Sequence, residues 1–235
     1  MKNMKLIFVV IFFLMASVFA YTQQCDPETH FVINIIDHGR AISIIDYIGN
    51  KTFVNIPPRI QNLPVTTIGF TSFKEKNIFN VIIPNSVTSI EGGAFNGNKL
   101  TNVTIPNSVI SIKSFAFANN QLDNILIPKS VIEIGSSAFA NNKLTNITIP
   151  NSISKIGDKA FFGNQLTSIT IEGNLNLTVD RGYMGFGDNK TKLQSRGIVP
   201  FGNGFEKIYT IWDTMGNNIG TYTRPNNNST EWRKQ

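Results

Sequence analysis

A 22-residue unit repeats four times between residues 78 and 165, and this repeat constrains the fold more than any other feature of the chain. A unit of this size cannot bury its own apolar side, so the copies must stack on one another. The sequence therefore predicts a repeat solenoid with a core of aligned columns. The columns are Phe95, Phe117, Phe139 and Phe161; Ile90, Ile112, Ile134 and Ile156; Asn98, Asn120, Asn142 and Asn164; Pro84, Pro106, Pro128 and Pro150; Ser86, Ser108, Ser130 and Ser152.

Each copy has the pattern of one β-rich coil. Residues 100–105 alternate between polar and apolar, which as a strand would send Val103 and Ile105 inward. A proline then ends this first strand, and residues 108–112 offer a second short extended piece. The Ala116-Phe117 pair is expected on a helical turn or bend, and we assign this pair to the repeat columns in preference to Phe115. Asn120 suits the corner that follows.

Degenerate copies flank the regular ones, as capped solenoid ends predict. Ile68 and Phe73 precede Ile90 and Phe95 by 22 residues, and residues 166–171 open a further copy that then dissolves. We expect a curved right-handed coil with a β cap at each end. The expected domains are a signal peptide at 1–20, an N-terminal β cap at 21–55 (strands 31–36, 41–47, 52–56), the solenoid at 56–171, and at 172–235 an irregular loop (174–204) and a C-terminal β-meander (strands 207–212, 219–223, 230–233).

The N-terminus has the order of a secretory signal peptide. Lys2 and Lys5 precede an apolar run at 6–15 and small residues up to Ala20, after which we expect cleavage. The run is too short for a membrane span, which needs about 20 apolar residues. Cys25 is the only cysteine, so the chain has no internal disulfide, and it is either a lipid-anchored residue or, as its polar neighbours favour, a free thiol.

The unit resembles the BspA-like, or TpLRR, class of bacterial leucine-rich repeats. That class reads Leu-x-x-Ile-x-Ile-Pro-x-Ser-Val-x-x-Ile-x-x-x-Ala-Phe, and the similarity covers roughly residues 31–171. The ending at 220–224 is similar to tails of spirochaete members. This chain departs from the class in its period of 22, where many members have 23, and in its asparagine where many have cysteine. The resemblance implies an exported bacterial solenoid, with members that are surface adhesins for host matrix proteins or other bacteria.

Residues that could support catalysis are sparse. His30 and His38 lie near Asp26, Glu28 and Asp37, which would allow a metal site, although turn and surface roles are favoured. The glycine-rich stretch at 182–187 lacks the strand and helix of a nucleotide-binding loop. We therefore expect a non-enzyme without cofactor, and we keep as an alternative an enzyme with its chemistry at 174–235. Charged residues make up only 15% of the chain, which argues against nucleic-acid binding.

Stacking would align the outward positions of the first strand into two neutral stripes. If these stripes line a concave face, that face suits proteins or glycans better than polyanions. The alternative is that the asparagines form hydrogen-bonded ladders that hold the sheet. The candidate residues are Asn80, Asn102, Asn124, Asn146 and Ser168 in one stripe, and Ile82, Thr104, Leu126, Thr148 and Thr170 in the other.

These features predict an exported binding protein that recognises a protein partner, such as a host extracellular-matrix or bacterial surface protein. A periplasmic structural protein that associates mainly with itself is the alternative from another class. The signal-peptide pattern predicts export. The sequence leaves open whether the protein is secreted, attached to the cell surface or kept in the periplasm.

Overall fold

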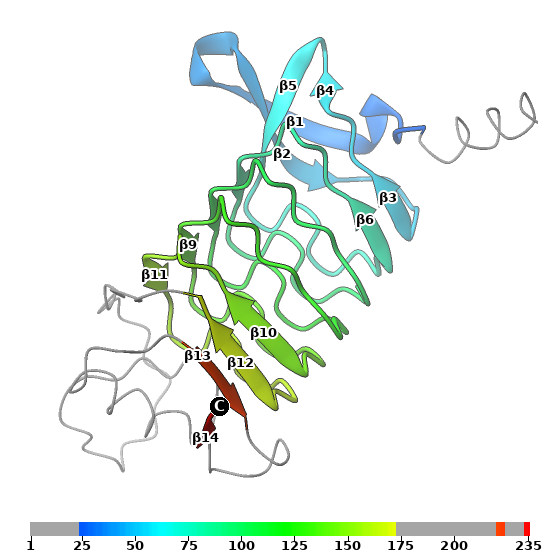
Figure 1. Cartoon of the computed structure of the whole chain (residues 1–235). Helices are drawn as coiled ribbons and strands as arrows, with labels where there is room; N and C mark the ends of the chain where they lie inside the picture. Colours follow the sequence, from blue (N-terminus) through cyan, green and yellow to red (C-terminus); the bar gives the residue numbers. More distant parts are fainter. Residues whose placement is uncertain (1–23, 173–219, 224–232) are drawn as a thin grey trace, which may run out of the picture.

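The structure is a computed structural model that describes residues 24–172, 220–223 and 233–235. The chain forms a β-solenoid, so the predicted leucine-rich-repeat architecture is confirmed (Figure 1). Its elements are η1 (Glu28–His30), β1 (Phe31–Ile36), η2 (Asp37–Gly39), β2 (Ala41–Tyr47), β3 (Phe53–Asn55), β4 (Arg59–Ile60), β5 (Leu63–Ile68), β6 (Asn80–Ile82), β7 (Ser89–Ile90), β8 (Ser111–Ile112), β9 (Glu133–Ile134), β10 (Asn146–Ile149), β11 (Lys155–Ile156), β12 (Ser168–Ile171), β13 (Gly220–Thr223) and β14 (Arg233–Lys234).

One parallel ladder runs along the solenoid and contains the second extended piece of each copy. The sheet has the order β1-β2-β5-β7-β8-β9-β11, with β4 paired to β5. From β7 onward each residue pairs with the residue 22 positions later, as in Ser89 with Ser111 and Ile90 with Ile112. The turns that follow are tight. At Gly135, for example, an added Cβ would lie 2.3 Å from the backbone nitrogen of Ser114, so a larger residue would separate the two coils.

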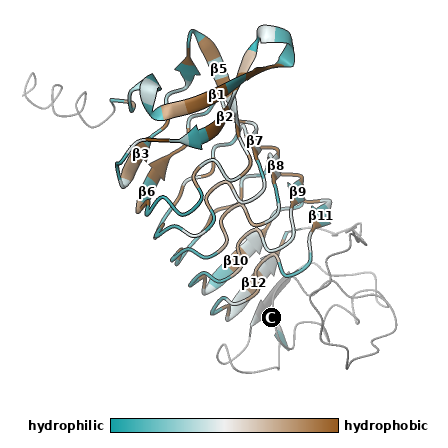
Figure 2. Ribbon diagram, turned by 180° about the vertical axis from the view of Figure 1, so that it is seen from behind, coloured by the Kyte–Doolittle hydropathy of each residue, from teal (hydrophilic) through white to brown (hydrophobic). Residues whose placement is uncertain are grey.

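The first extended piece forms a second, interrupted ladder on the other side of the coils (Figure 2). Here β3 pairs with β6, and β10 pairs with β12, in parallel. The predicted strands at 102–105 and 124–127 are not formed, although Val103 and Ile105 are buried as the alternation predicted. The centroids of neighbouring rings in the core are 5.0 to 5.5 Å apart, close to the ~4.8 Å between strands of a β ladder. The same coils pair in the long ladder, so the missing pairs are confined to the first extended piece.

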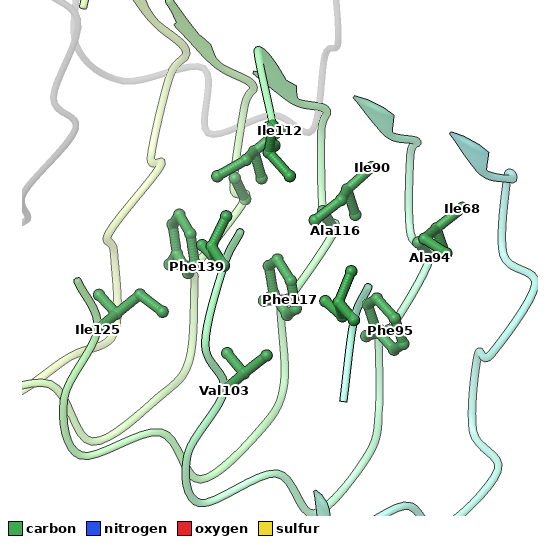
Figure 3. Packing of buried hydrophobic residues seen from close by; sticks show 14 of the residues in the cluster. Ile68, Ile90, Ala94, Phe95, Val103, Ile112, Ala116, Phe117, Ile125 and Phe139 are labelled. Carbon is green, nitrogen blue, oxygen red and sulfur yellow. The ribbon is translucent and has the colours of Figure 1, made fainter. Parts of the chain in front are cut away.

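Stacked aromatic rings form the centre of the core. Tyr47, Phe73, Phe95, Phe117, Phe139 and Phe161 follow one another, and the planes of the last two rings differ by only 4°. Figure 3 shows Phe95, Phe117 and Phe139 beside the isoleucine column and the small side chains Ala94 and Ala116. Phe117 is fully buried whereas Phe115 is 49% exposed, which confirms the chosen column. Each such side chain contributes about 1.5 to 3 kcal/mol by burial.

The asparagine column is buried and connects neighbouring coils. Asn142 is 6% exposed, and its Oδ1 accepts a hydrogen bond from the backbone N–H of Leu122 at 3.0 Å. Its Nδ2 donates to the carbonyl oxygens of Phe117 (2.9 Å) and Phe139 (3.1 Å). Asn98, Asn120 and Asn164 make equivalent bonds. The side chain thus satisfies backbone groups that a corner leaves without ladder partners.

The serine column adds a second set of bonds between coils. The hydroxyl of Ser108 donates to the carbonyl of Val87 at 2.6 Å, and Ser130 and Ser152 donate to Val109 and Val131. These bonds follow the proline in each copy, at the point where the chain leaves the first extended piece. The polar columns therefore fix the register of the coils that the apolar columns bring together.

Both ends of the solenoid carry additional strands. At the N-terminal end, β1 and β2 form an antiparallel hairpin, and β2 continues into the long ladder through β5. The third expected strand is β3, which joins the other ladder through β6. At the C-terminal end, β13 pairs antiparallel with β12, and β14 with β13. The expected strand 207–212, the loop 174–204 and the signal peptide 1–20 lie outside the described residues.

Candidate functional site: the first-strand face

All ten candidate residues lie on one surface, which we call the first-strand face. They alternate with buried residues, so that Asn80 and Ile82 are exposed on either side of buried Val81. Where the ladder is formed, the two stripes are in register, with Asn146 beside Ser168 and Thr148 beside Thr170. Asn102, Thr104, Asn124 and Leu126 are exposed as well. The structure therefore brings the predicted stripes together, with no charged side chain among their ten members.

One aromatic side chain, Phe53, extends this face into the N-terminal cap, and a second, Phe79, directly precedes Asn80 in the solenoid. Phe53 pairs with Asn80 in the β3–β6 ladder and is 49% exposed, so it continues the first stripe. Phe79 is also 49% exposed, and the ammonium of Lys99 lies 5.3 Å from the centre of its ring. Sequence reasoning missed Phe53 because it lies 27 residues before Asn80, outside the 22-residue register.

Hydrogen-bonded asparagine ladders do occur in this protein, but asparagines outside the stripes form them. Among the hydrogen bonds of the described residues, none joins one stripe asparagine to the next, and the side chain of Asn146 donates only to the neighbouring Thr145 hydroxyl, at 3.3 Å. The buried column around Asn120 joins coils instead, as does a surface ladder in which Asn141 donates to Asn119 and Asn119 to Asn96. The amides of the stripe are thus directed to solvent.

A depression of about 430 Å³ opens beside Leu126 on this face. Leu126 has 77% of its surface exposed, the largest fraction of any large apolar side chain in the described part of the chain. The depression has an apolar floor with hydroxyl and amide groups around it, and the ion pair of Lys129 with Glu172 (3.7 Å) lies at its edge. Its lining residues are Asn107, Leu126, Ile127, Pro128, Lys129, Ser130, Thr148, Pro150 and Glu172.

The outward side of the long ladder differs because its polar groups bind one another. Glu133 accepts from Lys113 at 2.7 Å and lies 3.2 Å from Lys155, and Ser89 lies 3.1 Å from Ser111. The hydrogen bond from Lys113, aided by Lys155, lowers the pKa of Glu133 below its ordinary value, even though partial burial acts in the opposite direction. These charges already have partners on neighbouring coils, whereas among the described residues no amide of the first-strand face bonds to a neighbouring coil.

The histidines and acidic residues of the N-terminal cap have separate roles. Asp26 is buried, forms an ion pair with Lys51 and accepts a bond from the backbone N–H of Asn55. His30 packs edge-on against Tyr47, while the His38 side chain is 94% exposed in a turn. No group of three potential metal ligands occurs within the described residues. Burial raises the pKa of Tyr47, whose hydroxyl accepts from the backbone N–H of Lys51.

The glycine-rich stretch 182–187 and most of the alternative enzyme region 174–235 fall outside the described residues. Within the part of the chain that the structure describes, no helix is long and apolar enough to cross a membrane. Cys25 is a free thiol of intermediate exposure.

Parallel coils with buried asparagine, isoleucine and phenylalanine columns define a leucine-rich-repeat solenoid, a class whose extended surfaces serve protein–protein interaction. The sequence model of the "BspA type Leucine rich repeat region" matches residues 66–183 in six copies. The chain belongs to this family, and the resemblance seen in the sequence is confirmed. The match also extends the repeat beyond the four regular copies.

Solved structures of bacterial leucine-rich repeat proteins are similar to this chain. The T. pallidum leucine-rich repeat protein TpLRR has 26% identity and a TM-score of 0.56, and the alignment covers 64% of this chain and 72% of that one. A leucine-rich repeat protein from Eubacterium ventriosum has 25% identity and a TM-score of 0.50, over 62% of this chain but only 43% of that one. A search of curated proteins found no match.

Proposed function

We propose that this protein is exported and binds a protein partner through the first-strand face, with Leu126 and the adjoining depression at the centre of the contact. The observation that carries the proposal is the exposure of Leu126: a leucine with 77% of its surface in water contributes little to the solenoid itself. Protein contacts commonly place an apolar anchor beside a pocket within a neutral polar surround. Asn102, Thr104 and Thr148 supply such a surround.

Two further observations support this surface as the contact. Phe53, Phe79 and Ile82 expose apolar surface at the N-terminal end of the same face, so that apolar groups lie on both sides of the Asn102 coil. On the opposite side of the coils, by contrast, the charged side chains of the long ladder bind one another. The signal-peptide pattern at 1–20 and the family resemblance favour export, and with it adhesion to host matrix proteins or to other bacterial cells, with glycan binding as a lesser role.

The test is binding to immobilised extracellular-matrix glycoproteins and to washed bacterial envelopes, measured by surface plasmon resonance. Asn102→Arg combined with Leu126→Arg places two cations on the first-strand face. Thr88→Arg combined with Ile132→Arg is the matched control, because it adds equal charge at exposed positions of the opposite ladder. We expect the first variant to bind at least about tenfold more weakly and the control to bind like the unaltered protein.

The outcomes separate the proposed face from the proposed location. Equal binding by both folded variants refutes the first-strand face, and loss in the control alone assigns the contact to the opposite ladder. Adhesion requires in addition that protease added to intact cells cleaves the protein or that the protein is found in the medium. Cleavage only after the cells are permeabilised would instead establish the periplasmic alternative.

A further inference from the structure

The outer edge of β1 has no partner strand among the described residues. β1 is the first strand of the long ladder. Its sequence, Phe31-Val-Ile-Asn-Ile-Ile36, contains no proline and no charged residue. An uncharged edge strand of six residues presents a row of unpaired backbone groups that favours pairing with another strand.

The hydrogen bonds of β2 show which groups of β1 face outward. The N–H of Tyr47 donates to Ser72, and the carbonyl of Ile44 accepts from Gly69, so both residues direct their backbone away from β1. Their partners across the hairpin are Phe31 and Ile33. Because bonded and unbonded pairs alternate in an antiparallel ladder, the N–H and C=O groups of Phe31, Ile33 and Ile35 point to the free edge.

From this edge we infer that a second copy of the chain pairs antiparallel with β1 about a two-fold axis centred on Asn34. This register places Ile33 opposite Ile35 and Val32 opposite Ile36, so that apolar residues meet on both faces of the new sheet. It covers the side chains of Ile35 and Val32, which are 50% and 39% exposed in the single chain. A two-fold pair uses the same edge from both copies and is therefore closed.

Antiparallel pairing brings the turn that follows β1 toward the segment that precedes β1 in the other copy. The charge of Arg40 in that turn is already balanced by Asp37, at 2.9 Å, so the apolar register and not an ion pair favours the arrangement. The dimer joins two solenoids at their N-terminal ends and leaves both first-strand faces open to a partner.

The primary test is sedimentation of the purified protein over a range of concentrations. We expect reversible dimers. Ile35→Lys should weaken the association at least roughly tenfold, because it places unpaired cations in the new ladder, while the half-exposed position accepts the charge in the single chain. Ile45→Lys is the matched control: Ile45 is 47% exposed on β2, away from the edge, and this variant should dimerise normally. Circular dichroism confirms that both variants fold.

A cross-linking experiment tests the register. Opposite residues of an unbonded antiparallel pair have Cα atoms about 4.5 Å apart, within the ~4.4 to 6.8 Å that a disulfide spans. In a Cys25→Ser background, Asn34→Cys should therefore form a covalent dimer on mild oxidation, whereas Ser43→Cys, on the neighbouring strand, should not. A protein that stays monomeric at all concentrations, a dimer unaffected by Ile35→Lys, or equal cross-linking of both cysteine variants would overturn the inference. The arginine variants of the first-strand face should dimerise normally, so this proposal and the proposed function can fail separately.

Discussion

Replacing Asn142 by aspartate tests whether the buried amide is what joins the coils. The substitution keeps the shape of the side chain and the Oδ1 that accepts from Leu122. It removes the donor bonds to the carbonyls of Phe117, Phe139 and Ala140. Each carbonyl keeps another donor: the side chain of Asn120 for Phe117, the side chain of Asn164 for Phe139 and the backbone N–H of Asn119 for Ala140. The lost bonds alone should then cost about 1 to 3 kcal/mol.

The charge of the new carboxylate adds to this cost and makes it depend on pH. At neutral pH an anion would face three carbonyl oxygens in a site that is 6% exposed, which disfavours the charged form and raises the pKa of the introduced carboxyl in the folded state. A raised folded-state pKa means that the native protein binds the proton more tightly than the unfolded chain does. The variant therefore recovers stability, relative to the unaltered protein, as the pH falls through that pKa.

The assay is urea unfolding followed by circular dichroism at about pH 7.5 and about pH 4.5, on either side of the expected change. Asn119→Asp is the matched control, because Asn119 lies on the exposed surface ladder and its single donor bond goes to Asn96. We expect a control effect below about 1 kcal/mol at both pH values. A variant at Asn142 that is as stable as this control, or whose deficit does not shrink at acid pH, would show that the buried amide does not join the coils.

Two further predictions concern stability. Phe139→Ala should lower the free energy of unfolding by about 3 to 5 kcal/mol, because the ring is fully buried between two stacked neighbours. Phe162→Ala, at a 41% exposed position, should lower it by less than about 1 kcal/mol. Equal urea midpoints for the two variants would contradict the stacked core. Glu133→Gln should lose up to about 1 kcal/mol at neutral pH, and the deficit should disappear as the pH falls below 4.5, because a lowered pKa contributes stability only while the carboxylate is charged. A deficit that does not change between neutral and acid pH would contradict the ion-pair network of Glu133.

The inward columns could be predicted from the sequence because every copy has to bury the same positions of the repeat. A residue such as Phe117 meets its own equivalents 22 positions away on both sides, so one assignment of the inward direction had to satisfy all copies at once. The same alignment correctly excluded Phe115. The strand at 100–105 was predicted wrongly because alternation indicates which side chains are buried and does not determine whether the backbones of neighbouring coils pair.

Features that occur only once were harder to predict. Phe53 joins the first stripe only through the pairing of β3 with β6, and no periodicity marks that contact. The free edge of β1 could not be predicted from the repeat either, because β1 lies outside the repeating copies. The asparagine column was placed at a corner correctly, but its donation to carbonyls of two different coils depends on the distance between those coils. The sequence supplies the residue type and not that distance.

The outward columns need a different argument, because repetition alone does not explain their chemistry. An inward residue is constrained by its own coil, so a departure from the column costs packing. An outward residue has no such constraint, and threonine serves the coil as well as leucine at position 126. A leucine there exposes apolar surface without gaining a contact inside the solenoid, and it does so beside a depression with an apolar floor. The departures from the polar pattern, at Ile82 and Leu126, are therefore the positions on this face where a partner would gain most from contact.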